Sequence, residues 1–337
     1  MLAESYLHSL NPFAIQITET IGLRWYGLAY LTGFLIAWLL IRRFSKKGLT
    51  PLTKEQSGDF VLSSVLGVVV GDRLGYVLFY QPELLITFEP TFPWWEAIAI
   101  HKGGMSSHGG MLGVLVTMVY WSRKHGVGLP HLMDLGPYVA VPGLCLGRVA
   151  NFVNGELWGR KLPEQLQKEP PFWSVKYPTE ITEVWVQFPD AHQQKLNTLL
   201  ELQSTVLGEN NFYQNIVYEA YKGNQTIIDT ITPLLTAWYP SQLYQAATNG
   251  FLLFVVLTII WWKPRKEGVV AGWFLVVYGL FRIVTEAYRQ PDEGVALVAG
   301  LTRGQLLSVL MVVAGCALVS FFSRRSVDKT GGVKNIF

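Results

Sequence analysis

The segment from Gly147 to Gly159 reads G-R-V-A-N-F-V-N-G-E-L-W-G and places polar side chains at the end of a long apolar run. If that run crosses a membrane, these side chains lie at or inside the edge of the hydrocarbon. Charged groups at that depth are costly and usually face a cavity or a partner. This segment, called the polar segment below, therefore predicts a site for the charged part of a lipid-embedded ligand. Its candidate residues are Arg148, Asn151, Asn154, Glu156 and Gly159.

A second group of candidates lies in a later apolar run, where Arg282, Glu286 and Arg289 are spaced by four and three residues. This spacing puts the three side chains on one helix face. Arg148 belongs to a different run but lies at a similar expected depth. A guanidinium is always charged and its fork matches phosphate, so a phospholipid headgroup is a natural partner. Internal pairing of Arg282 with Glu286 is the alternative, and spacing alone does not decide.

A glycine-rich break, residues 101–110, reads H-K-G-G-M-S-S-H-G-G and is called the histidine segment. Paired glycines allow irregular backbone and the close approach of a ligand. Irregular backbone at membrane depth is tolerated only where it lines protein or a cavity. His108, at the mouth of the next apolar run, is therefore a candidate functional residue, although a lone histidine is more often structural.

The elements that must position these residues follow from the composition. Of the 337 residues, 50% are hydrophobic and only 15% are charged, whereas a soluble domain has about 25% charged residues. Together with several apolar runs of about 20 residues, this predicts an all-α polytopic membrane protein. About seven transmembrane helices are expected, over residues 23–41, 60–80, 109–121, 132–153, 240–262, 269–288 and 305–322.

The loops set the expected orientation. Basic residues gather at 42–54, 123–124, 263–266 and 324–334, and these loops alternate with loops that lack such clusters. The positive-inside rule therefore puts the N-terminus outside and the C-terminus in the cytoplasm. All the candidates named above then lie in the outer half of the membrane.

Three parts are expected along the chain. Residues 1–159 form a membrane domain with spans one to four, and residues 239–337 form a membrane domain with spans five to seven and a cytoplasmic tail. Residues 160–238 are polar and aromatic without a spanning run, which predicts an extracytoplasmic head domain of mixed structure. Within it, Thr182–Phe188 favours a strand and Ala191–Leu207 a helix.

The second span carries two further features. Gly67, Gly71 and Gly75 recur every four residues, so they share a face and permit close helix packing. Asp72 and Arg73 are sequence neighbours that point in different directions, so each needs its own partner. Structural ion pairing is the expected role of both.

Five separated motifs, in the same order along the chain, resemble the prolipoprotein diacylglyceryl transferase family of bacterial inner membranes. The polar segment fits the family signature G-R-x-x-N-F-x-N-x-E-x-x-G. The other four are R-W-Y-G-L from Arg24, G-G-M-S-S-H-G-G from Gly103, Y-P-S-Q-L-Y from Tyr239 and Y-G-L-F-R-I-V-T-E-A-Y-R-Q-P-D from Tyr278. Gln245 departs from the pattern, because an acidic residue often follows the S-Q-L-Y tyrosine in the family.

The resemblance implies transfer of the diacylglyceryl group from phosphatidylglycerol to the lipobox cysteine thiol of a preprolipoprotein. The products are a thioether and glycerol 1-phosphate, in the first step of lipoprotein maturation. Phosphatidylglycerol, the lipobox peptide and membrane lipids are the expected partners, and nucleic acid is not. No cofactor or metal is expected. The expected location is the bacterial inner membrane.

The reaction needs a base for the thiol and positive charge for the leaving phosphate. His108 is the candidate base, with Glu156 or Glu286 as the alternative. Arg148 and Arg282 would stabilise the phosphate. The expected substrate-binding residues are Tyr26, Asn151, Asn154, Gly159, Tyr244, Tyr278 and Arg289.

A transporter of anionic lipids or small anions could use the same arginines. Transporters often show internal repeats and a site near the midplane. The sequence shows no repeat, and its polar groups cluster on the outer side. The family signature therefore favours the enzyme.

Overall fold

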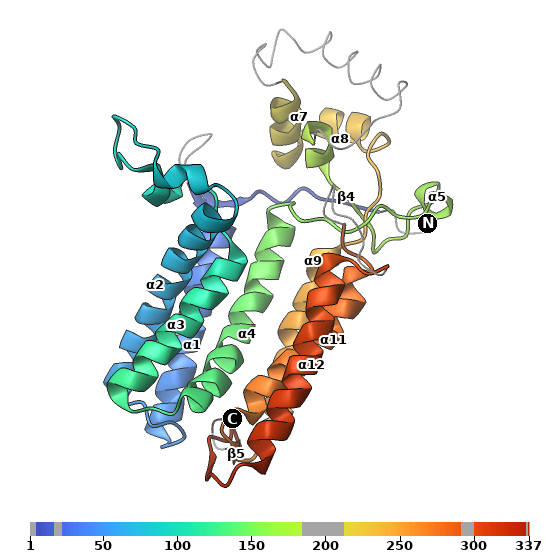
Figure 1. The fold of residues 1–337 in the computed structure, drawn as a ribbon. Coiled ribbons are helices and arrows are strands. Elements are labelled where there is room, and N and C mark those ends of the chain that lie inside the picture. Colours follow the sequence, from blue (N-terminus) through green and yellow to red (C-terminus); the bar gives the residue numbers. More distant parts are fainter. Residues whose placement is uncertain (1–4, 17–21, 184–211, 291–299, 335, 337) are drawn as a thin grey trace. The chain divides into compact units, whose positions relative to one another are not determined.

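The computed structural model describes residues 5–16, 22–183, 212–290, 300–334 and 336, which are mostly helical (Figure 1). Each of the seven predicted apolar runs forms a helix. One of them is built from three consecutive pieces, α9, the π-helical η5 and α10. The helices are α1 (Trp25–Lys46), α2 (Lys54–Phe79), α3 (Ser107–His125), α4 (Leu129–Val153), α9 (Ser241–Gln245), η5 (Ala246–Leu252), α10 (Leu253–Ile260), α11 (Val269–Glu286) and α12 (Arg303–Arg324).

Five of these helices are long and apolar enough to cross a membrane by length and composition. They are α1, α2, the continuous Ser241–Ile260 helix, α11 and α12. Large apolar side chains point outward from them, with 63% of Leu31 and 62% of Val313 exposed. Such faces suit a lipid environment and confirm a polytopic membrane protein. The α3 and α4 helices are not among the five, because each carries several polar residues, and the count of seven spans stays a prediction.

The chain forms two compact units. The first unit contains residues 1–31, 144–252 and 279–309, and the second contains residues 32–143, 253–278 and 310–337. The division falls within α1, α4, α11 and α12. It does not test the predicted division at residues 159 and 238.

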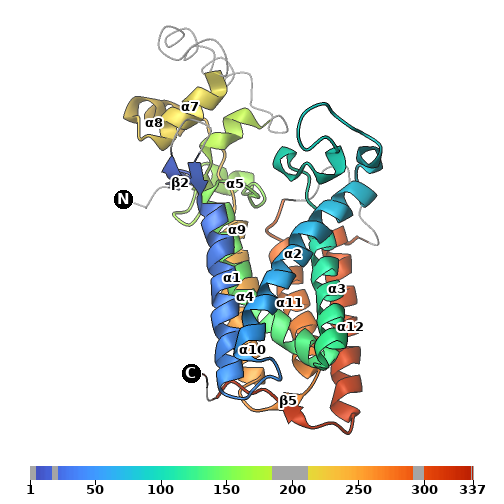
Figure 2. The ribbon, with the colours of Figure 1, turned by 90° about the vertical axis from the view of Figure 1, so that its left-hand side faces the viewer.

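Within the second unit, α2 and α3 lie side by side (Figures 1 and 2). A Cβ added at Gly75 would lie 2.7 Å from the Cα of Gly109, and one at Gly67 would lie 2.8 Å from the carbonyl oxygen of Gly113. Neither contact leaves room for a side chain, so the helix backbones approach closely only because glycine is present. The predicted packing role of the α2 glycines is confirmed.

The loop between α2 and α3 contains three short 3-10 helices, η1 (Pro82–Leu85), η2 (Glu96–Ile98) and η3 (Ile100–Lys102). At the other end of the second unit, the Asp134 carboxylate accepts hydrogen bonds from Gly268 N at 2.7 Å and Ala271 N at 2.6 Å. It thus caps the first turn of α11. Strands β5 (Arg265–Lys266) and β6 (Lys329–Thr330) pair antiparallel nearby.

In the first unit, the N-terminal residues join the polar region that follows α4. Strand β1 (Tyr6–Leu7) pairs parallel with β4 (Val175–Lys176), and β2 (Phe13–Gln16) pairs antiparallel with β3 (Gly22–Arg24) directly before α1 (Figure 2). The remaining elements are α5 (Glu164–Gln167), η4 (Pro178–Thr182), α7 (Phe212–Tyr221) and α8 (Gln225–Ile231).

Two apolar clusters hold this region together. One contains Ile181, Ile216, Ala220, Ile227, Ile231, Leu234 and Leu235. The other contains Trp158, Val175, Tyr177 and Trp238. Described residues of 160–238 therefore form helices, a strand and an apolar core, and the head domain itself stays a prediction. The strand and helix expected at 182–188 and 191–207 fall mainly on residues 184–211, outside the described residues.

Candidate functional site

The polar segment leaves α4 through a left-handed turn. The helix ends at Val153, and Gly155 then adopts a φ of +63°, where glycine is favoured because it has no Cβ. The Glu156 N–H donates back to the Asn151 carbonyl at 3.1 Å, and the Asn154 amide donates to Glu156 Oε1 at 3.2 Å. The turn therefore brings Asn151, Asn154 and Glu156 together.

The next residues of the polar segment are held by the start of α9. The Gln242 side chain, 1% exposed, donates from Nε2 to the Glu156 carbonyl at 2.8 Å. The Ser241 hydroxyl donates to the Leu157 carbonyl at 3.3 Å. Gln242 is a positioning residue that sequence reasoning missed, although the Y-P-S-Q-L-Y motif that contains it was found.

Gly159 occupies a place where no side chain fits. A Cβ there would overlap the Tyr239 carbonyl oxygen and lie 2.6 Å from that of Tyr288. The Gly159 N–H donates to the Tyr239 carbonyl at 3.0 Å, and Gly159 forms an antiparallel bridge with Arg289. Two predicted site residues from distant parts of the chain, Gly159 and Arg289, thus lie together.

His8 fixes the polar segment from the N-terminal side. Its Nε2 donates to the Phe152 carbonyl at 2.6 Å, and the residue is 0% exposed. Its Nδ1 has no hydrogen-bond partner among the described residues, so the imidazole is the neutral Nε2–H tautomer. Burial lowers the pKa of His8 from 6.5 to about 4. Sequence reasoning missed His8, because the contact spans 144 positions and no motif surrounds it.

An ion cluster lies at the end of α11. Glu286, 3% exposed, pairs with Arg282 (Nη2 to Oε2, 3.1 Å) and with Arg289 (Nη1 to Oε1, 3.5 Å). The internal pairing considered as an alternative for Arg282 is therefore present. One buried carboxylate therefore orients two arginines.

Gln245 completes this cluster from α9. Its Oε1 accepts a hydrogen bond from Arg282 Nη1 at 3.1 Å, and the residue is 3% exposed. A neutral amide oxygen thus accepts from Arg282 without placing a negative charge beside it.

Two side-chain oxygens of the polar segment are buried and unpaired. Asn151 is 4% exposed, and the Oδ1 atoms of Asn151 and Asn154 have no hydrogen-bond partner in the part of the chain that is described. Buried polar atoms are normally hydrogen-bonded, because an unmade bond costs about 1–3 kcal/mol. These oxygens therefore point to a donor supplied by a ligand or by water.

The tyrosine candidates lie in different surroundings. The Tyr26 hydroxyl meets that of Tyr30 at 3.4 Å in the first turns of α1. The rings of Tyr244 and Tyr288 make an edge contact at 5.4 Å. Tyr278 belongs to the second unit, where its ring packs at 5.6 Å from that of Phe274.

His108 also belongs to the second unit and is the second residue of α3. Its side chain is exposed. Ser106 caps the helix, accepting from the Gly109 N–H at 3.4 Å. The other candidates, from Tyr26 and Arg148 to Arg289, are in the first unit.

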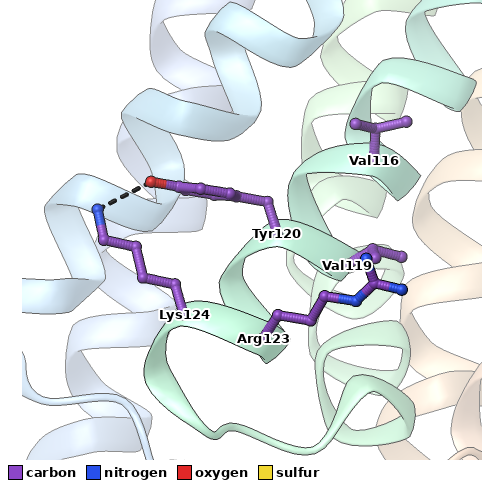
Figure 3. A pocket seen from close by; sticks show the side chains of 5 residues that line it. All are labelled: Val116, Val119, Tyr120, Arg123 and Lys124. Atoms are coloured by element: carbon purple, nitrogen blue, oxygen red, sulfur yellow. Dashed lines mark hydrogen bonds between the residues drawn. The ribbon is translucent and has the colours of Figure 1, made fainter.

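An open pocket lies on the surface of α3 toward its C-terminal end (Figure 3). It is lined by Val116, Val119, Tyr120, Arg123 and Lys124, with Lys124 Nζ donating to the Tyr120 hydroxyl at 2.8 Å. None of these residues is a predicted site residue. The pocket therefore does not mark the candidate site.

Comparison with known proteins gives consistent matches. The model of the family described as Prolipoprotein diacylglyceryl transferase matches residues 12–321. A phosphatidylglycerol–prolipoprotein diacylglyceryl transferase of Bdellovibrio bacteriovorus is 36% identical over 340 residues, covering 97% of this chain and 96% of the relative. Proteins of the same name from Neisseria gonorrhoeae and Chromobacterium violaceum are each 37% identical, covering 91% and 94% of this chain and 94% and 96% of the relatives.

Proposed function

Because the chain belongs to the prolipoprotein diacylglyceryl transferase family, we propose that it transfers the diacylglyceryl group of phosphatidylglycerol to the lipobox cysteine of preprolipoproteins. The reaction forms a thioether and releases glycerol 1-phosphate. One observation carries the proposal: the family match over residues 12–321 includes every predicted site residue, from Tyr26 to Arg289.

Arg148 and Arg282 are assigned to the phosphate. The phosphoryl oxygens gain negative charge as the C–O bond breaks, and a fixed positive charge stabilises that change. The ion pairs of Arg282 and Arg289 with Glu286 support this role, because they hold the Arg282 guanidinium in a fixed position. Gln245 supports it further, since an amide holds Arg282 without adding a negative charge.

The asparagines of the polar segment are assigned to the glycerol of the headgroup. The unpaired oxygens of Asn151 and Asn154 accept hydrogen bonds, and the hydroxyl groups of phosphatidylglycerol donate them. A headgroup that ends in an ammonium would present a charge instead of two hydroxyls. Gly159 and Arg289 hold the end of the segment, and Tyr26, Tyr244 and Tyr278 provide amphipathic rings for the lipid.

His108 is assigned as the base. The substrate thiol, with an ordinary pKa of about 8.5, must lose its proton to become a good nucleophile. In this scheme the thiol proton passes to His108, the sulfur bonds to carbon 3 of the glyceryl group, and the C–O bond to phosphate breaks. Glu156 and Glu286 remain the alternative bases. Glu286 is the weaker of these two, because it already pairs with two arginines.

The membrane placement belongs to the same proposal. Seven spans, with the N-terminus outside and the C-terminus in the cytoplasm of a bacterial inner membrane, put the catalytic residues in the outer half. The basic loops support that orientation. A secreted preprolipoprotein and an anionic lipid are both present on that side.

The test is a covalent change in a thiol peptide. Purified protein in phosphatidylglycerol vesicles would receive a lipobox peptide, with its cysteine-to-serine counterpart as control. The proposal expects thioether product and glycerol 1-phosphate from the cysteine peptide alone. Movement of phosphatidylglycerol between leaflets with neither product would support the transporter instead.

The base is tested separately with His108→Ala. Loss of a general base is expected to lower kcat by about 10²–10⁴-fold, with partial recovery at alkaline pH, where the thiol ionises unaided. Turnover close to that of the wild type would remove His108 from the mechanism and leave the overall reaction intact.

A further inference from the structure

Arg73 of α2 has an unusual set of partners in the second unit. The residue is 5% exposed, and its guanidinium donates to four backbone carbonyls of the loop that leads into α3. Nε donates to Ala97 O at 2.8 Å and Nη2 to Glu96 O at 2.5 Å. Nη1 donates to Gly103 O at 2.6 Å and Gly104 O at 3.0 Å. No ion pair of Arg73 is present among the described residues, so the predicted ion pairing is wrong for this residue.

The backbone at Gly104 is also held by contact with a second α2 side chain, Tyr76. The φ of Gly104 is +75°, and an added Cβ would overlap the ring of Tyr76. The Arg73 guanidinium lies 5.7 Å from the centroid of that same ring. Arg73 and Tyr76, one turn apart on α2, therefore fix the backbone of the histidine segment immediately before α3.

Asp72 holds the other side of the histidine. Its backbone carbonyl accepts from the Ser106 N–H at 3.0 Å, and its carboxylate packs against Gly110, where an added Cβ would overlap Oδ1. These contacts fall two residues before and two residues after His108. The Asp72 carboxylate has no ion pair among the residues that the structure describes, so its predicted ion pairing is also wrong.

The geometry points to Arg73 and Asp72 as positioning residues that set the place of His108 in the reaction. This inference rests on the proposed role of His108 as base. Arg73 fixes residues 96–104, Asp72 fixes residues 106–110, and His108 projects from the backbone between them. The Arg73 side chain makes four hydrogen bonds to this loop and the Asp72 backbone carbonyl accepts a fifth, which is more than α2 and α3 need in order to pack through their glycines.

A buried arginine is an expensive way to hold a loop unless the loop must be placed accurately. Guanidinium has five donors in a fixed fork, so it can satisfy four carbonyls that point at one spot. Lysine keeps the charge but presents its donors from a single nitrogen. The Arg73→Lys substitution therefore tests whether the loop needs the geometry of the guanidinium or only a positive charge.

The first readout is hydrogen–deuterium exchange of the full protein in lipid nanodiscs. Arg73→Lys is expected to speed exchange of the amides in residues 96–110. Arg123→Lys is the matched control, because Arg123 is an exposed arginine of α3 in the same unit and lies outside the proposed site. Unchanged exchange in Arg73→Lys would overturn the inference, whatever the activity of the enzyme.

The second readout is kinetic. Arg73→Lys is expected to lower kcat between about 10-fold and 100-fold, the size expected for a misplacement of about 1 Å, with little change in the KM for the lipobox peptide. In a His108→Ala background the same substitution should cost less than about 2-fold, because the placed group is gone. Equal losses in both backgrounds would show that Arg73 does not act through His108.

A second variant keeps the inference testable if Arg73→Lys does not fold. Gly104→Ala displaces the same backbone by overlap with Tyr76 and leaves Arg73 in place. Gly103→Ala is its control, because Gly103 also has a positive φ, of +84°, but has no atom within 4 Å of the added Cβ. A larger loss of kcat in Gly104→Ala than in Gly103→Ala is expected, and equal losses would contradict the inference. If His108→Ala proves fully active, the proposed base fails while the exchange result still decides whether Arg73 holds the loop.

Discussion

Glu286 and Arg282 form an ion pair one helical turn apart, with 3.1 Å between Oε2 and Nη2 and with the carboxylate almost wholly buried. Arg289 reaches the other carboxylate oxygen at 3.5 Å, and the Thr302 hydroxyl donates to it at 3.3 Å. The carboxylate thus orients two arginines. In the proposed reaction, this arrangement holds Arg282 in a fixed position for the phosphate.

Removing the Glu286 charge should loosen this cluster. Glu286→Gln is expected to lower the free energy of unfolding by up to about 3 kcal/mol, because breaking a buried pair leaves its partners uncompensated. It should also lower kcat, since Arg282 loses its fixed position. Thermal unfolding in detergent and the transferase assay measure the two effects.

The matched control is Glu219→Gln. Glu219 pairs with the exposed Lys222 at 3.2 Å, and a surface pair of this kind contributes about 0–1 kcal/mol. Equal stability losses in the two variants would show that burial of Glu286 does not matter. Unchanged kcat in Glu286→Gln would remove the carboxylate from the orientation of Arg282.

Gly159→Ala should disrupt the end of the polar segment. The added Cβ would meet two backbone oxygens, of Tyr239 and Tyr288, which cannot turn away as a flexible side chain could. We expect a stability loss of roughly 1–3 kcal/mol and a fall in activity. Gly147→Ala tests the specificity of this effect, because no atom lies within 4 Å of its added Cβ and alanine favours a helix. If the Gly159→Ala variant were as stable as the Gly147→Ala variant, the explanation from packing at Gly159 would be contradicted.

His8 should make stability depend on pH. Its folded pKa, about 4, lies below its unfolded value of 6.5, so the unfolded chain binds the proton more readily. The stability it contributes is fully present above about pH 6.5 and is lost as the pH falls toward 4. Tyr177 and Tyr221 face the imidazole, and burial raises the pKa of both phenols, so they stay neutral over this range.

The measurement compares wild type with His8→Gln at about pH 7.5 and about pH 5. Glutamine can still donate to the Phe152 carbonyl but does not titrate. On acidification, the unfolding temperature of the wild type should fall further than that of the variant. Burial also raises the pKa of Glu180, whose protonation favours the folded state on acidification and therefore acts in the opposite direction in both proteins. Equal decreases in the unfolding temperature of the two proteins would show that His8 does not cause the pH dependence of stability.

The sequence predicted the helices well because their signals are local. Apolar runs and basic loop ends mark α11 and α12 within two residues of their observed bounds, and α1 and α2 within six. The glycines of α2 reveal their role by spacing alone, since every fourth residue shares a face. The polar segment was found in the same way, because arginine and asparagine stand out in an apolar run.

The partners of these residues could not be predicted, because they come from distant parts of the chain. His8 meets Phe152 across 144 positions, and Gln242 meets Glu156 across 86. Contacts between residues so far apart in the chain leave no periodic pattern in the sequence. Arg73 was noticed as a charge in an apolar run, but an ion pair was expected, because a search for partners by residue type overlooks backbone carbonyls.

Arg148 is the residue whose role the proposed reaction defines most sharply. If its fork binds two phosphate oxygens, Arg148→Lys should lower kcat/KM for phosphatidylglycerol by at least about tenfold, because lysine keeps the charge but loses the bidentate contact. Wild-type kcat/KM in that variant would show that Arg148 acts only as a point charge or not at all.

Mass spectrometry of a lipobox cysteine peptide, incubated with purified protein and phosphatidylglycerol, tests the central claim most directly. Wild type is predicted to add the mass of one diacylglyceryl group through a thioether, and Arg148→Ala is predicted to slow this gain by about 10²–10³-fold. A gain that survives Arg148→Ala at the wild-type rate would move the phosphate site elsewhere. No gain with folded wild-type protein and a full-length precursor would contradict the assignment as a transferase.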